Sequence, residues 1–211
     1  MFELLLITDP DAPRGLVGSV EAALQGADGV RLAVQLRAKQ MSLPALLPIA
    51  RELRELTQRA GARLFINGRL ELAREVGADG VQLPETGLTP RAARALLGPG
   101  PLIGASCHDP IGLARAAQGG ASFATVSPVF HSPGKGPAIG SARFADWARA
   151  AQLPVFALGG IRAEHAALLR RKGARGLAVI SSVFYAHDPA AAVRDLLSAW
   201  HGAAASVADR A

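Results

Sequence analysis

The octapeptide GADGVQLP, residues 77–84, joins a glycine that can end a helix directly to a short apolar segment. Related sequences recur as GADGV at 26–30, GASFATV at 120–126 and GARGLAV at 173–179. Successive copies start about 50 residues apart, which is long enough for two strand–helix units. The repeat therefore indicates tight turns from a helix into a buried strand at regular points along the chain.

Apolar and amphipathic segments alternate on both sides of these turns. Strands are predicted at 2–9, 30–39, 63–67, 80–84, 102–108, 123–130, 154–161 and 176–184. Helices are predicted at 17–25, 42–60, 69–77, 89–98, 109–118, 141–151, 162–172 and 188–200, several with capping signals. This strict alternation favours an α/β fold of the (β/α)8 TIM-barrel type over a doubly wound open sheet. We expect one domain over 1–211, with its core at about 2–200 and a flexible tail at 201–211.

Composition excludes several classes of protein. The chain has 211 residues, 50% hydrophobic and 19% charged, and a formal net charge of +6. Many arginines stand beside acidic residues in helical segments, and aromatic residues make up 5%, so no nucleic-acid partner is expected. No basic segment precedes the first apolar run, and no run approaches the length of a membrane span. One cysteine, Cys107, excludes an internal disulfide; we expect a cytoplasmic protein without a membrane partner.

Polar residues near the carboxyl ends of the predicted strands are the candidates for a functional site, because that face of a barrel carries the active site. In VQLRAKQ, residues 34–40, the side chains of Gln35, Arg37 and Lys39 alternate and project to one side of a strand. A guanidinium beside an ammonium suits a mono- or diphosphate. The alternative is a cluster of ion pairs at the end of the strand.

A second anion site is predicted after the seventh and eighth strands. In ALGGI, residues 157–161, Gly159 and Gly160 allow backbone amides to approach a phosphate closely. In AVISSVF, residues 178–184, Ser181 and Ser182 can add hydroxyl donors. Together these segments match the phosphate-binding position of many barrels.

The segment SPVFHSPGKGPAIG, residues 127–140, is predicted to be a loop over the same face. His131 and Lys135 are the candidate catalytic residues, His131 as a proton carrier and Lys135 as an anion ligand, and Ser132 is expected to bind substrate. The alternative is that His131 is an exposed loop residue with no role. Cys107 and His108 are neighbours on a strand and point to opposite faces, so they cannot act as a nucleophile–base pair; a role for His108 stays open.

The ordered motifs VQLRAK, INGRLELAREVGADGVQLPE, IGASCHD, SPVFHSPGKG, PVFALGGI and GLAVISSVF resemble the thiamine phosphate synthase and thiazole tautomerase (TenI) family. The resemblance implies a (β/α)8 barrel acting in thiamine biosynthesis. The synthase joins an aminopyrimidine pyrophosphate to thiazole phosphate with magnesium, and the tautomerase aromatises the thiazole phosphate. The resemblance assigns the pyrophosphate side to Gln35, Arg37 and Lys39, further substrate contacts to Asn67, Ser106 and Lys135, and the thiazole phosphate to Gly160, Ile180 and Ser181.

The chain departs from the synthase pattern at two expected magnesium ligands. Gly68 and Gly87 stand where the synthase has aspartates, and Glu85 is two positions early. VQLP resembles the tautomerase, although Pro128 stands where the tautomerase has its histidine and His131 follows three residues later. We therefore expect a tautomerase-like enzyme that binds thiazole phosphate, without a metal site. The alternatives are a synthase, for which magnesium and aminopyrimidine pyrophosphate would be needed, and a non-catalytic thiamine phosphate binder. A homodimer is left open.

Overall fold

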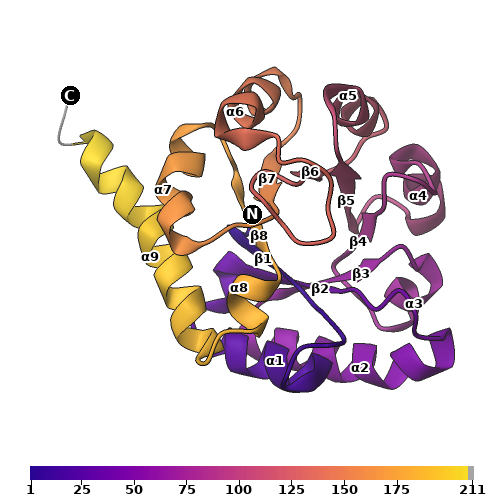
Figure 1. The fold of residues 1–211 in the computed structure, drawn as a ribbon. Helices are drawn as coiled ribbons and strands as arrows, with labels where there is room; N and C mark the ends of the chain where they lie inside the picture. The colour runs from indigo at the N-terminus through magenta and orange to yellow at the C-terminus, as the bar shows by residue number, and fades with distance from the viewer. Residues whose placement is uncertain (209–211) are drawn as a thin grey trace.

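Eight parallel strands close into a barrel in the computed structural model, which describes residues 1–208 (Figure 1). Each strand pairs with the next in sequence order, and β8 returns to β1 through the pair Leu4 and Leu177. The (β/α)8 prediction is therefore confirmed. The strands are β1 (Leu4–Ile7), β2 (Leu32–Leu36), β3 (Arg63–Asn67), β4 (Gly80–Leu83), β5 (Leu102–Cys107), β6 (Phe123–Val126), β7 (Val155–Leu158) and β8 (Gly176–Val179).

Helices surround the barrel as an outer ring in Figure 1. The predicted caps form: Ser42, Thr89 and Asp109 each accept a hydrogen bond from the backbone N–H three residues later. No helix within residues 1–208 is both long and apolar enough to cross a membrane. The helices are α1 (Gly15–Leu24), the 3₁₀ helix η1 (Gly29–Arg31), α2 (Leu43–Ala60), α3 (Leu70–Glu75), α4 (Pro90–Leu97), α5 (Pro110–Gln118), α6 (Gly140–Ala150), α7 (Ala163–Arg171), α8 (Ser181–Phe184) and α9 (Pro189–Ala208).

Most predicted elements differ from the observed ones at their ends, and three of these differences bear on the site or on the end of the chain. The strand expected at 176–184 ends at Val179, because Ile180 leaves the extended conformation at φ −125° and ψ −84° and the chain continues as α8. The strand expected at 30–39 is shortened to β2, so Arg37 and Lys39 lie in the loop beyond it. Helix α9 continues to Ala208, and the last part of the expected tail, 209–211, lies outside the described residues.

Phenylalanine rings fill one end of the barrel and form the floor under the site. Phe2, Phe65, Phe123 and Phe156 are fully buried, and their contacting ring centroids lie 4.9–5.5 Å apart. Such edge and tilted contacts are the favourable arrangements of aromatic pairs. The four rings close the barrel below the strand carboxyl ends.

Glycines on neighbouring strands make room for these rings. Gly80 pairs with Phe65 in the sheet, and a Cβ at Gly80 would lie 2.7 Å from that ring. Gly104 stands in the same relation to Phe123, at 2.5 Å. The second glycine of the repeat GADGV at 77–81 is therefore required by packing, because a Cβ there would overlap the Leu102 carbonyl oxygen as well as crowd the aromatic ring.

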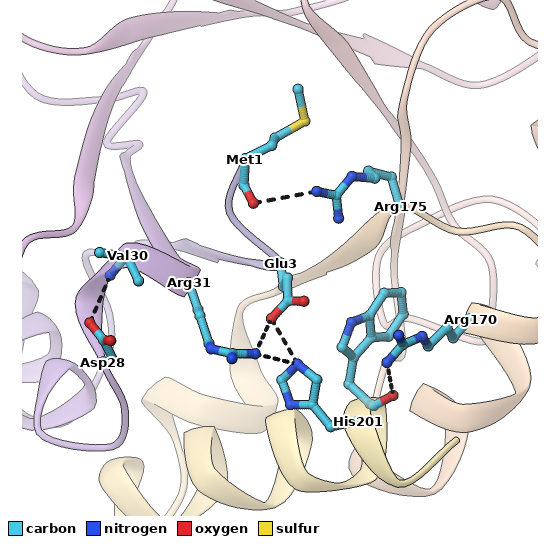
Figure 2. A network of polar contacts seen from close by, with 9 residues as sticks. Met1, Glu3, Asp28, Val30, Arg31, Arg170, Arg175 and His201 are labelled. Carbon is cyan, nitrogen blue, oxygen red and sulfur yellow. Dashed lines mark hydrogen bonds and ion pairs between the residues drawn. The ribbon is translucent and has the colours of Figure 1, made fainter. Parts of the chain in front are cut away.

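Polar contacts join the last helix to the amino-terminal ends of the strands, as Figure 2 shows. The Glu3 carboxylate lies 2.9 Å from His201 Nε2 on α9 and 3.0 Å from the Arg31 guanidinium on η1. Arg175 donates to the carbonyl of Met1. The contacts of His201 fasten α9 at the barrel face opposite the site, and the Arg175 contact ties down the amino terminus beside it.

Candidate functional site

A cavity of about 380 Å³ opens at the carboxyl ends of the strands. Its position is the one expected for the active site of a barrel. Every predicted site residue except His131 lines it, namely Gln35, Arg37, Lys39, Asn67, Ser106, Ser132, Lys135, Gly159, Gly160, Ile180, Ser181 and Ser182. The structure thus brings together residues from six separate segments of the chain.

His131 lies outside this cavity. Its side chain is exposed and lines a neighbouring hollow together with Arg162 and His165. His165 in turn stacks on Phe130, with ring centroids 4.0 Å apart. The described geometry therefore gives no support to His131 as a proton carrier in the main cavity.

Neutral amides and hydroxyls cover the floor of the cavity above the aromatic rings. Gln35 and Gln82 are buried, and Gln35 Nε2 donates to Asn67 Oδ1 at 3.4 Å. Gln82 Nε2 donates to Ser106 Oγ at 3.1 Å and to Thr125 Oγ1 at 3.3 Å. Buried polar groups in such a network hold one arrangement, so a ligand meets a preorganised set of hydrogen-bond partners.

Thr8 fixes the loop that carries Arg37. Its hydroxyl accepts from the Arg37 backbone N–H at 2.9 Å and donates to the Arg37 carbonyl at 3.3 Å. Thr8 follows β1 and is 1% exposed, so this double contact is shielded from water. The backbone of Arg37 is therefore positioned although it lies beyond the end of β2.

Three cationic side chains line the cavity without a counter-charge; we call Arg37, Lys39 and Lys135 the cationic mouth. Among the described residues, none of the three forms an ion pair. The alternative of an ion-pair cluster at the end of β2 is therefore not what the structure shows. Unpaired cations at a cavity favour binding of an anion.

The loops after β6, β7 and β8 meet on another part of the rim. Gly160 has φ +64°, and the Phe130 N–H donates to the Gly159 carbonyl at 3.0 Å. Ser182 Oγ is buried without a hydrogen-bond partner among the described residues. The predicted phosphate cradle thus contains the Ser182 hydroxyl, which is available for a hydrogen bond to a ligand, and glycines with positive φ.

Further polar residues line the cavity that were not selected as site residues from the sequence. Thr125 lies on the sixth strand and Ser127 in the loop after it. Both could have been predicted from the sequence, because every second residue after the inward-facing Phe123 points to the same side. His108 also lines the cavity, and its Nδ1 lies 2.6 Å from the Ser127 carbonyl. Because a carbonyl oxygen only accepts, Nδ1 carries the hydrogen and Nε2 is left facing Glu85 at 3.8 Å.

Cys107 is an inert neighbour of this site. It is buried, and burial raises the pKa of its thiol to about 12, with the Glu85 and Asp109 charges acting in the same direction. A thiol with so high a pKa is not a nucleophile at neutral pH.

The donor set of the cavity does not fit magnesium. Mg²⁺ is usually held by one or two carboxylates beside substrate phosphates. Of the residues lining the cavity, Glu85 alone has a carboxylate, and it already faces His108. Within residues 1–208 no three His, Cys, Asp or Glu side chains are grouped so that they could hold a metal ion.

Comparison with known proteins gives consistent matches. The family model described as thiamine monophosphate synthase matches residues 4–183. The thiamine-phosphate synthase of Thiobacillus denitrificans is 44% identical over 191 residues, covering 89% of this chain and 88% of that protein. That of Roseiflexus castenholzii is 38% identical over 196 residues, covering 90% and 85%. Thiamine phosphate pyrophosphorylase from Pyrococcus furiosus superposes with a TM-score of 0.87 at 30% identity, covering 96% of both chains.

These comparisons show that the expected tautomerase-like activity is wrong. The relatives are named as synthases, which favours the synthase alternative. In addition, His131, to which the tautomerase interpretation gave the proton transfer, does not line the main cavity. The resemblance seen in the sequence motifs is confirmed at the level of the family: the chain belongs to the thiamine monophosphate synthase family, enzymes of thiamine biosynthesis that act on phosphorylated small molecules.

Proposed function

We propose that this enzyme joins an aminopyrimidine pyrophosphate to thiazole phosphate and releases pyrophosphate. The observation that carries the proposal is that one cavity is lined both by the three cations of the cationic mouth and by the glycines and serines of the predicted phosphate cradle. The two parts suit two different phosphate groups, one that leaves and one that stays. An enzyme that bound thiazole phosphate alone would need only the cradle.

The cationic mouth stabilises the leaving group in this proposal. As the bond between the pyrimidine methylene carbon and pyrophosphate breaks, its electron pair leaves with the pyrophosphate oxygen, and a carbon–nitrogen bond forms to the thiazole. Arg37, Lys39 and Lys135 neutralise the negative charge that develops. Preorganised charges of this kind need no rearrangement at the moment of reaction.

The other parts of the cavity hold the two rings. The amide groups of Gln35 and Asn67, together with Ser106, lie where they can hydrogen-bond an aminopyrimidine. Gly160, Ser181 and Ser182, with neighbouring Gly159 and Ile180, hold the thiazole phosphate through backbone and hydroxyl donors. Fixing both rings within reaction distance converts the coupling into an effectively unimolecular step.

The test is direct synthesis. Purified protein is mixed with both substrates, and thiamine phosphate and pyrophosphate are measured together; we expect them to form in equal amounts. Arg37→Ala should lower kcat/KM by about 10–100-fold, whereas Arg171→Ala, an exposed arginine at the end of α7, should not. A folded wild-type protein that forms no thiamine phosphate would refute the proposal. The predicted cytoplasmic location and the homodimer stay predictions.

A further inference from the structure

We infer that the cationic mouth binds pyrophosphate without a divalent cation held by the protein. The inference rests on the proposed function and states its cofactor requirement. Resemblance to the synthase implies magnesium, but the side chains that line the cavity do not supply the ligands that magnesium needs.

The charges at the mouth are the first argument. Arg37, Lys39 and Lys135 all line the cavity and, within the described chain, have no ionic partner. A divalent cation brought to this place would meet three positive charges, and like charges repel strongly in a partly enclosed site. Pyrophosphate, by contrast, brings the negative charge that the three side chains lack.

Glu85 is the second argument, because it is the carboxylate that a metal would have to use. Its Oε2 lies 3.8 Å from His108 Nε2. Its Oε1 lies 3.1 Å from the point that a Cβ at Gly112 would occupy, so the carboxylate rests against the first turn of α5. The positive end of this helix partly offsets the charge of the carboxylate.

The two glycines at the synthase's aspartate positions are the third argument. Gly68 has φ +67° and Gly87 has φ +150°, both in conformations that L side chains rarely adopt. A Cβ at either position would make only an ordinary van der Waals contact with the ring of Pro84, at 3.7 Å and 3.6 Å, so the positive φ, and not crowding, favours glycine. The backbone at both positions is thus suited to glycine. Among the residues that line the cavity, Glu85 has the one carboxylate that could replace the two aspartates.

The backbone that carries one of the three cations is also held in place. The Arg37 backbone is fixed by two hydrogen bonds to the Thr8 hydroxyl. A positioned guanidinium can bind two phosphate oxygens at once, and the lysines add point charges. These groups supply the neutralisation that a bound metal supplies elsewhere.

The test is calorimetric titration of the whole protein with inorganic pyrophosphate, once in EDTA and once in excess magnesium. We expect binding in EDTA to be as tight as in magnesium within a factor of about 3. Arg37→Ala and Lys39→Ala should each weaken it about 10–100-fold in both buffers, and Arg171→Ala should leave it unchanged.

Glu85→Gln separates the inference from its rival. If Glu85 held a metal, this variant would lose pyrophosphate binding in magnesium; we expect unchanged or tighter binding, because a negative charge is removed from the mouth. Binding seen only with magnesium, or a loss of more than about threefold in EDTA, would overturn the inference. Because no coupling is needed, failure of synthesis with metal-independent binding would refute the proposed function alone.

Discussion

Replacing Gly160 by alanine tests how the phosphate cradle is built. Gly160 has φ +64°, and a Cβ there would overlap the carbonyl oxygen of His131 and lie 2.9 Å from Phe130 Cβ. The loops after β6 and β7 are joined at this point by the hydrogen bond from Phe130 N–H to Gly159. Alanine must therefore adopt a left-handed backbone and also push the two loops apart.

The size of the effect follows from these two costs. A left-handed alanine costs about 1–2 kcal/mol. Losing the hydrogen bond between the loops adds about 0.5–1.5 kcal/mol. The free energy of unfolding should fall by about 1.5–3.5 kcal/mol in total, and binding of thiazole phosphate should weaken because its donors have moved.

Gly120→Ala is the matched control. Gly120 has φ +79° but has no other atom within 4 Å of the position of a Cβ. The free energy of unfolding of Gly120→Ala should therefore fall only by the cost of the left-handed backbone, about 1–2 kcal/mol. The affinity of this variant for thiazole phosphate should be unchanged. Urea unfolding and phosphate-ester titration measure both quantities. Equal destabilisation of the two variants, with equal affinity, would show that close approach of the loops does not shape the cradle.

Three further outcomes follow from the fold. Cys107, with a pKa raised by burial to about 12, should react with Ellman's reagent only after unfolding; rapid labelling of the native protein would contradict this. Phe123→Ala should lower the free energy of unfolding by about 3–5 kcal/mol, because it empties the centre of the aromatic floor; a loss below about 1 kcal/mol in urea would argue against that packing. Burial raises the pKa of Glu3, but His201 and Arg31 lower it further, so the pKa is below its ordinary value. The resulting stability is present above a pH of about 4.3 and is lost as the pH falls through the lowered pKa. Tm should accordingly fall more steeply in acid for wild type than for Glu3→Gln, and parallel curves would exclude this contribution.

Periodicity was sufficient to predict the barrel because each strand lies between two helix-like segments with recognisable ends. Ser42, Thr89 and Asp109 were visible as caps and act as caps. The boundary at Ile180 was missed because Val183 and Phe184 are as apolar as a buried strand, although they are buried on a helix. Burial alone does not distinguish the two.

Most of the candidate site was also predictable, because the carboxyl ends of parallel strands meet at one face. Arg37 and Lys39 line the cavity from a loop, so they reach the predicted face although they do not alternate on a strand as predicted. The direction of His131 could not be foreseen, since it depends on how the loop after β6 packs against Gly160. Gly68 and Gly87, where the synthase has aspartates, led to the tautomerase prediction, which was wrong. The absence of a metal ligand does not by itself identify which reaction an enzyme catalyses.

In the glycine–phenylalanine pairs under the site, the ring of one residue occupies the space beside the other residue, on the neighbouring strand. Phe65 and Gly80 share a fixed space, so enlarging the glycine crowds the barrel as surely as shrinking the ring leaves a void. Shrinking the ring alone would not make room for a side chain at position 80, because a Cβ there would also overlap the backbone carbonyl oxygen of Leu102 on β5. The glycine is thus required by the spacing of the sheet itself, and only the ring position can change in size, at the cost of a void beneath the cavity.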